Sequence, residues 1–363
     1  MNAPAYSILA INPGSTSTKV ALFNDTKKVI QQDLEHAQED LGRYNRVWDQ
    51  MIFRRRAVEQ FLFDNFKDDT SLDGVAGRGG LFRSIPGGVY KVNSIMLNDA
   101  ESGIQGEHAS NLGCAVATAI AEKYGCEAYV VDPVSTDELE SIARFSGHPS
   151  IQRRSLSHAL NLHYVARTVA AQLEIELEKS RFVIAHLGGG ISVAPLLGGR
   201  IVDVNDANNE GPFSPTRSGT LPPLTLSRWI LAQELDFPEV KVELLKKSGL
   251  QGYLGTADGR LIEQRIRDGD ETAREILEAM AYQIAKEIAA MSSVLSGNVY
   301  RIILTGGLAN FTRLMELITD RIDWIAPVKI HAGEYEMEAL AGGVYRVLTQ
   351  QEQPRKYPSG ELL

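Results

Sequence analysis

The chain contains one arrangement of strands and turns twice, and this repetition limits the folds that it can adopt. Residues 7–34 read as strand, turn, strand, turn, strand, with the first turn at Asn12-Pro13-Gly14. Residues 182–206 repeat the order, with the first turn at Gly188-Gly189-Gly190 and the third strand over 200–206. One such unit opens each half of the chain, which predicts a duplicated α/β architecture of two domains.

Both first turns carry groups that can hold phosphate. The earlier turn offers an amide at Asn12, a cation at Lys19 and hydroxyls at Ser15, Thr16, Ser17 and Thr18. Such groups, together with backbone N–H groups, can cradle phosphate oxygens. Three adjacent glycines in the later turn let the backbone approach a ligand that a Cβ atom would exclude. A surface hairpin with a polar tip is the structural alternative, but the repetition favours a nucleotide gripped between two domains.

The composition fits a two-domain globular chain, because 363 residues with 44% apolar and 23% charged side chains can bury a sizeable core. A net charge of −9 argues against nucleic-acid binding by bulk electrostatics. Two cysteines are too few for a disulfide framework or a cysteine metal site, which indicates a reducing compartment. No signal peptide is recognisable, and no apolar run reaches the roughly 18 residues of a membrane span. We expect a cytoplasmic protein without nucleic-acid or membrane partners.

The sequence predicts a first domain over residues 1–150 and a second domain over residues 151–344. The last helix and tail, from about 345 to 363, are expected to pack on the first domain. The second domain carries the glycine turn and a later strand-to-helix junction at Gly306-Gly307. Residues 35–70 read as a charged helical region with a solvated face, which includes Arg54, Arg55 and Arg56.

Two arginines lie beside glycines, where the planar guanidinium can be presented to a phosphate or a carboxylate. Arg78 belongs to the segment Gly77-Arg78-Gly79-Gly80, and an ordinary loop arginine is its structural alternative. Arg217 belongs to Thr216-Arg217-Ser218-Gly219, at the end of a long polar stretch over 203–219. Such a stretch is either a mobile loop or a functional one.

Three further positions are candidates for chemistry. His108 stands at the entrance of a helix expected over 106–124, where the helix dipole favours anions, and a capping role is the alternative. Asp132 follows a buried strand, the place where α/β sheets carry functional groups, and a helix N-cap is the alternative. The junction at Gly306-Gly307 leaves a gap for adenine or ribose, although helix-on-strand packing explains the same glycines.

The chain resembles the acetate kinase family over nearly its full length. Five motifs occur in the order seen in that family: 12–19, Gly77-Arg78-Gly79-Gly80, 186–190, Thr216-Arg217-Ser218-Gly219 and 304–307. Within the family, residues 157–161 and 208–217 are similar to the butyrate kinases rather than the acetate kinases. The resemblance implies duplicated ribonuclease-H-like domains, as in actin-like ATPases, with the nucleotide in an interdomain cleft.

The resemblance also implies an activity: ATP-dependent, reversible, in-line phosphorylation of a short-chain carboxylic acid such as butyrate to its acyl phosphate. The implied cofactors are ATP or ADP and Mg²⁺, and the implied assembly is a homodimer or a higher homo-oligomer. An ionised carboxylate needs no strong general base, because its pKa lies near ~4. Catalysis then comes from alignment and from neutralising charge on the phosphoryl oxygens.

Site residues carried over by resemblance fall into three groups. Catalysis is assigned to Arg78, Arg217 and His158 around the transferring phosphoryl, and to Asp132, which with Glu338 would hold the magnesium ion. Nucleotide binding is assigned to Asn12, Ser15, Ser17, Lys19, His186, Gly188, Gly189, Gly190, Gly306 and Gly307. Substrate binding is assigned to Arg78, His108 and Ser157.

Two positions depart from the acetate kinases. Gly189 stands where they carry an asparagine, so the backbone must do the work of that side chain. Ser157 stands where they carry a phenylalanine, and the smaller side chain would open the acyl pocket to acids longer than acetate. An acetate or propionate kinase is the nearest alternative. A kinase that uses Asp132 to deprotonate a hydroxyl group and a chaperone-type or actin-like ATPase without a small-molecule substrate are the others.

Overall fold

Contacts within the chain group it into two units. The structure, a computed structural model, describes residues 5–65 and 71–358. The first unit comprises Met1–Asp137, Ala159–Asn161 and Tyr335–Leu363, and the second comprises Glu138–His158 and Leu162–Glu334. The domain limits expected from the sequence, near 150 and about 345, stay predictions. The opening segment of the first unit ends at Asp137, before residue 150, because residues 138–158 form hydrogen bonds with the second unit. For example, the Glu140 N–H donates to the Val202 carbonyl at 3.0 Å.

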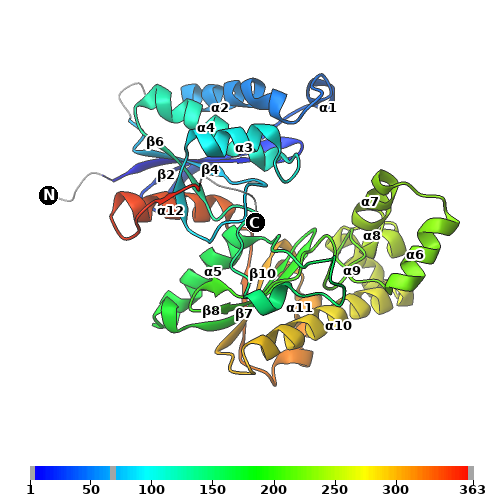
Figure 1. Cartoon of the computed structure of the whole chain (residues 1–363). Helices are drawn as coiled ribbons and strands as arrows, with labels where there is room; N and C mark the ends of the chain where they lie inside the picture. Colours follow the sequence, from blue (N-terminus) through cyan, green and yellow to red (C-terminus); the bar gives the residue numbers. More distant parts are fainter. Residues whose placement is uncertain (1–4, 66–70, 359–363) are drawn as a thin grey trace. The chain divides into compact units, whose positions relative to one another are not determined.

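The first unit is built on a sheet with the strand order β12-β5-β6-β4-β1-β2-β3 (Figure 1). Strands β1, β2 and β3 form an antiparallel meander, β4 runs parallel to β1, and β6 runs parallel to β4. The strands are β1 (Ser7–Pro13), β2 (Ser17–Asn24), β3 (Lys27–Glu35), β4 (Gly74–Arg78), β5 (Val89–Lys91), β6 (Glu127–Val131) and β12 (Arg355–Lys356).

Helices cover both faces of this sheet. Neighbouring residues of a strand face opposite sides. A Cβ atom on Gly77 of β4 would lie 2.6 Å from the carbonyl carbon of Gly113 in α4, and one on Gly74 would lie 2.7 Å from Val344 in α12. The two glycines therefore let one helix close on each face. The helices are α1 (Gln38–Leu41), η1 (Trp48–Gln50), α2 (Met51–Asn65), α3 (Ser94–Ser102), η2 (Ala109–Asn111), α4 (Leu112–Tyr124) and α12 (Glu336–Leu348).

The second unit repeats the plan with the strand order β11-β10-β7-β8-β9. Strands β7, β8 and β9 are antiparallel neighbours, and β10 and β11 run parallel to β7. The strands are β7 (Arg181–Leu187), β8 (Ile191–Leu197), β9 (Arg200–Ile201), β10 (Arg301–Gly306) and β11 (Val328–Ala332). The order matches β6-β4-β1-β2-β3 of the first unit, which confirms the duplicated fold predicted from the repeated pattern.

One predicted strand is much shorter than expected. The sequence places the third strand of the second unit over 200–206, but β9 ends at Ile201. The side chain of Asn205 replaces the missing ladder. Its Oδ1 accepts the Val193 N–H at 2.6 Å, and its Nδ2 donates to the Ile191 carbonyl at 2.8 Å. A buried amide thus satisfies the free edge of β8 in place of a neighbouring backbone.

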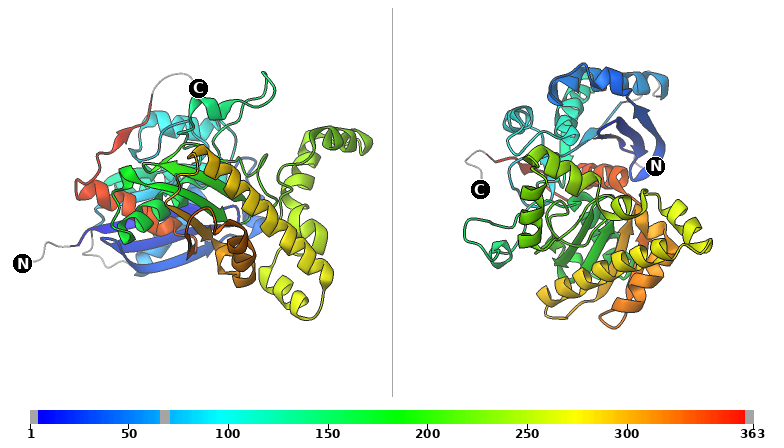
Figure 2. Two further views of the ribbon diagram at one scale, coloured as in Figure 1. Left: turned by 90° about the horizontal axis from the view of Figure 1, so that it is seen from below. Right: turned by 90° about the vertical axis from the view of Figure 1, so that its right-hand side faces the viewer.

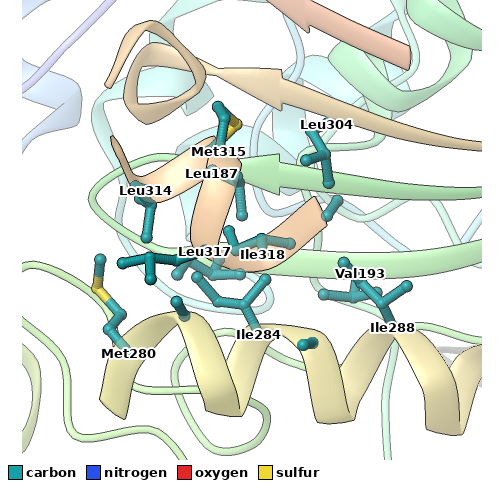
Figure 3. Packing of buried hydrophobic residues seen from close by; sticks show 14 of the residues in the cluster. Leu187, Val193, Met280, Ile284, Ile288, Leu304, Leu314, Met315, Leu317 and Ile318 are labelled. Carbon is teal, nitrogen blue, oxygen red and sulfur yellow. The ribbon is translucent and has the colours of Figure 1, made fainter. Parts of the chain in front are cut away.

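The core of the second unit lies between the sheet and two helices. Apolar side chains of α10 (Glu271–Val294) and α11 (Thr312–Ile322) meet those of β7, β8 and β10 in Figure 3, with Ile288 of α10 close to Val193 and Ile284 close to Ile318. The yellow helix α10 crosses the green strands in both views of Figure 2. The remaining helices are η3 (Ser141–Arg144), α5 (Ala159–Gln172), η4 (Leu177–Lys179), α6 (Pro223–Ala232), α7 (Phe237–Lys246), α8 (Gly249–Leu254), α9 (Gly259–Arg267) and η5 (Gly307–Asn310).

Within residues 5–65 and 71–358, no helix combines the length and the apolar character that crossing a lipid bilayer requires.

Candidate functional site

A cavity of about 210 Å³ opens in the first unit beside the β1–β2 turn. Five of its lining residues are ones that the sequence singled out: Asn12, Ser17, Lys19, Arg78 and His108. The others are Pro13, Gly14, Ser110, Val134 and Glu336. Ser15 is exposed at the turn and lies outside this lining.

The parallel pairing of β1 with β4 explains how distant residues reach the cavity. Ile11 is opposite Gly77 in this pair, so Asn12 and Arg78 both lie at the carboxyl ends of neighbouring strands. Ends of parallel strands meet at one edge of a sheet, which is where open α/β sheets bind ligands. The β1–β2 hairpin adds Ser17 and Lys19 from the first residues of β2.

Glu336 joins two of these residues and was not identified from the sequence. Its Oε2 accepts from Asn12 Nδ2 at 2.6 Å, and its Oε1 lies 3.0 Å from Nη1 of Arg78, a side chain that is 7% exposed. The sequence predicts that Glu336, Met337 and Glu338 open the last helix, and α12 does begin at Glu336, but this pattern does not show which of the two glutamates faces the cavity. A helix turns about 100° per residue, so residues two apart point in nearly opposite directions.

Glu338, which the sequence assigns to a metal ion, faces elsewhere. Its Oε1 pairs with Lys28 Nζ at 2.8 Å, and it does not line the cavity. Asp132, its expected partner, is 3% exposed and accepts the Gly88 N–H on Oδ1 at 2.6 Å. Asp132 also lies outside the lining and has a left-handed backbone, with φ of +38°. Among the described residues, no group of three or more His, Cys, Asp or Glu side chains could hold a metal ion.

His108 caps a helix, which was its structural alternative, and it also lines the cavity. It is the N-cap of η2, and its Nδ1 accepts the Ser110 N–H at 3.2 Å and lies 2.7 Å from the Ser110 hydroxyl. Burial lowers the pKa of His108, and the positive charge of Arg78 lowers it further. The imidazole is therefore neutral at neutral pH and adds hydrogen-bonding capacity rather than charge to the cavity.

In the second unit, the glycine turn and Arg217 lie together. A Cβ atom on Gly190 would lie 2.7 Å from Cζ of Arg217, so this glycine makes room for the guanidinium. A Cβ atom on Gly189 would have no neighbour within 4 Å. The Ser214 hydroxyl donates to the Gly189 carbonyl at 2.6 Å. Burial lowers the pKa of Arg217, and Asp206 opposes that shift. A Cβ atom on Gly188 would meet Nε2 of His186 at 3.2 Å.

The two histidines predicted in this half are stacked on each other. The ring centroids of His158 and His186 are 4.0 Å apart, with planes inclined by 16°. Nδ1 of His158 lies 3.0 Å from the Ser192 hydroxyl, near the start of β8. Ser157, directly before His158, is 7% exposed, and its hydroxyl has no hydrogen-bond partner among the described residues.

Gly306 and Gly307 have different surroundings. Gly306 has φ of +92°, and a Cβ atom there would lie 2.7 Å from the backbone nitrogen of Leu187, so close packing of β10 on β7 accounts for this glycine. Gly307 is more open, because a Cβ atom there would meet only the Glu334 carboxylate, at 3.6 Å. The expected contact of both glycines with adenosine stays a prediction.

Behind the β1–β2 turn lies a buried hydrogen-bond pair that the sequence pattern did not reveal. Oγ1 of Thr18 and Nε2 of His36 are 2.8 Å apart, and the His36 N–H donates to the Thr16 carbonyl at 2.9 Å. Burial lowers the pKa of His36 to about 4, and the positive charge of Arg54 contributes to that shift. His36 is thus neutral at neutral pH and fixes the buried side of the turn.

Comparison with known proteins places these residues in a family. Residues 147–327 match the acetokinase family. A probable butyrate kinase 2 of Caldanaerobacter subterraneus subsp. tengcongensis is 45% identical over 97% of this chain and 99% of its own length. Butyrate kinase 2 of Clostridium acetobutylicum is 43% identical over 97% of this chain and 99% of its own length.

Solved structures show the fold at lower identity. The acetate kinase of Porphyromonas gingivalis matches with a TM-score of 0.76 at 20% identity, covering 94% of this chain and 99% of that chain. A propionate kinase of Francisella tularensis matches with a TM-score of 0.73 at 19% identity, covering 93% of this chain and 98% of that chain.

The depressed pKa of His36 predicts a loss of stability in acid. Between pH 6.5 and about 4 the unfolded chain binds a proton on this histidine and the folded chain does not, so the free energy of unfolding falls as the pH falls through this window. We expect His36 to account for about 2 kcal/mol of that fall, allowing for solvent screening. Urea unfolding of the native protein and of His36→Gln at pH 7 and pH 4 measures it. Equal losses in the two proteins would contradict the assignment.

Proposed function

Since this chain belongs to the butyrate kinases of the acetokinase family, we propose that it transfers the γ-phosphoryl group of ATP to the carboxylate of a short-chain fatty acid. The near-full-length identity of 43–45% to butyrate kinases carries this proposal. The cavity at the β1–β2 turn supports it, because Lys19 and Arg78 supply positive charge and Asn12 and Ser17 supply polar groups for phosphate oxygens.

The reaction follows from the chemistry of the acid. A carboxylate oxygen forms a bond to the γ-phosphorus, the bond from that phosphorus to the bridging oxygen breaks, and ADP leaves with the electron pair. The nucleophile is already ionised at neutral pH, so no residue has to remove a proton. Arg78, Arg217 and His158 are proposed to neutralise the charge on the phosphoryl oxygens, which is the main task of a protein in phosphoryl transfer.

Glu336 fits the magnesium ion better than the two carboxylates expected from the sequence. Mg²⁺ prefers oxygen ligands and is usually held by one or two carboxylates together with substrate phosphates and water. Glu336 is a cavity carboxylate beside the Asn12 amide, whereas Asp132 and Glu338 lie outside the lining. We therefore place the ion at Glu336 and Asn12. When bound there, Mg²⁺ would neutralise phosphate charge.

Ser157 is proposed to set the room for the acyl chain. It is buried beside His158, and its hydroxyl is not committed to a partner among the described residues. A small side chain here leaves space that the phenylalanine of acetate kinases would fill. One methylene group in a pocket is worth only about 1–3 kcal/mol, so neighbouring chain lengths should overlap as substrates.

A homodimer or higher homo-oligomer is the proposed assembly. Helices α6 and α7 of the second unit have no buried residue, although they carry large apolar side chains. Leu224, Leu231 and Phe237 are each at least 75% exposed. A second copy of the chain is the proposed cover for this apolar surface.

Trapping of the activated acyl group tests the reaction and the pocket together. Hydroxylamine captures an acyl phosphate as its hydroxamate. With ATP, Mg²⁺ and acids from acetate to valerate, we expect product with several acids and the highest kcat/KM at four carbons. A maximum at acetate would remove the role given to Ser157 and leave the reaction intact. ATP turnover without any trapped product would contradict the proposed function.

The glycine turn offers a matched pair of variants. Gly190→Ala puts a methyl group against the Arg217 guanidinium and should displace it, whereas Gly189→Ala has open space. We expect Gly190→Ala to lower kcat on the order of 100-fold, by analogy with the loss of an arginine in phosphoryl transfer, and Gly189→Ala to lower it far less. Steady-state kinetics with ATP and butyrate measure both. Similar kcat values for the two variants would show that the position of Arg217 is not limiting.

A further inference from the structure

We propose that Arg54 is a positioning residue whose buried, unpaired positive charge lies behind the β1–β2 turn. The phosphate chain of the bound nucleotide supplies its counter-ion. The proposal rests on the proposed function, because it deepens the phosphate site of that function. The sequence predicts Arg54 on a solvated helix face, and the structure contradicts this. The side chain is 0% exposed and, within residues 5–65 and 71–358, is the largest of the fully buried side chains.

Every N–H group of the Arg54 guanidinium is engaged. An arginine offers five such donors. Nη1 donates to the Ser17 carbonyl at 2.8 Å and to the Thr18 hydroxyl at 3.1 Å, and Nη2 donates to the Ser15 carbonyl at 3.2 Å. The remaining two bonds, at 3.1 Å from Nε and 2.9 Å from Nη2, go to the Gln50 amide oxygen. Geometrically, the group is satisfied.

Electrically, the group is not satisfied. All of these acceptors are neutral, and none of the ion pairs among the described residues involves Arg54. Burial lowers the pKa of Arg54 to about 10, so it stays charged at neutral pH, while His36 on the other side of Thr18 stays neutral. A buried charge without a partner costs several kcal/mol. A polyanion bound at the turn offsets that cost, and the same charge therefore favours binding.

Arg54 also sets the direction of the turn. It draws the carbonyl groups of Ser15 and Ser17 to the buried side of the hairpin, where their negative ends cannot face a phosphate. The Thr18 hydroxyl accepts from Arg54 at 3.1 Å, and its oxygen lies 2.8 Å from Nε2 of His36, so this side chain is also held on the buried side. The open side of the turn is left with groups that can donate to phosphate, such as the Ser17 hydroxyl and Lys19.

Binding of adenosine, ADP and ATP by titration calorimetry separates charge from structure. We expect Arg54→Met to weaken ADP and ATP binding by about tenfold or more and to leave adenosine binding unchanged, because only the phosphates respond to the charge. Arg56→Met, which removes an exposed arginine two positions later on α2, is the matched control and should bind ADP like the native protein. Urea unfolding establishes that each variant is folded.

A second variant adds a counter-ion without removing the arginine. Gln50→Glu puts a carboxylate at the acceptor that already receives two of the Arg54 bonds. We expect this protein to be at least as stable as the native one and to bind ADP several-fold more weakly, with adenosine unaffected. If Arg54→Met does not fold, Gln50→Glu alone tests the proposal. If Arg54 were purely structural, the protein would keep its affinity for ADP when Arg54 gains this carboxylate partner.

The outcomes distinguish this inference from the function on which it rests. ADP binding within twofold of the native value in folded Arg54→Met and Gln50→Glu would overturn the role of Arg54, whatever the native protein catalyses. A weakening that is equal for adenosine and ADP would overturn it too, because it would reflect a distorted site. If the native protein forms no acyl phosphate but the ADP-specific loss is found, the proposed function fails and the role of Arg54 stands.

Discussion

The carboxylate of Glu336 connects the parts of the chain that form the phosphate cavity. Its two oxygens contact Arg78 at the end of β4 and Asn12 at the end of β1, although Glu336 itself opens the helix near the C-terminus. Lysine and arginine side chains gathered in one site repel one another until an anion binds between them. Glu336 supplies a negative charge among these cations, and the C-terminal helix is thereby attached to the edge of the sheet where the ligand is proposed to bind.

Close approach between elements gives this edge its shape. Gly77 and Gly113 bring α4 against β4 one residue before Arg78, and Gly190 makes room for the guanidinium of Arg217 in the other unit. Behind the first turn, Arg54 contributes a buried charge and a set of directed hydrogen bonds. In both units, glycines thus leave the room that lets an arginine lie close to a turn. The first unit has a second, buried arginine behind its turn.

The fold was predictable because its signals are local. The alternation of apolar strands with turn residues in residues 7–34 and 182–206 indicates the repeated meander, and the structure confirms the duplication. The early end of β9 was not predictable, because the Asn205 amide that replaces the ladder acts across a loop. The choice between Glu336 and Glu338 was not predictable, although α12 begins at Glu336 as expected, because it depends on which face of the helix meets the ends of β1 and β4. Arg54 was misjudged because burial of one arginine within a charged run depends on which face of α2 meets the hairpin.

Phosphorus NMR of the native protein with ATP, Mg²⁺ and butyrate tests the central claim most directly, since it identifies the atom that accepts the phosphoryl group. We predict that ADP and a new acyl phosphate signal grow in equal amounts, and that added ADP reverses the reaction. Release of inorganic phosphate alone, or phosphorylation only when a hydroxyl compound is supplied, would contradict the claim that this chain phosphorylates a carboxylate.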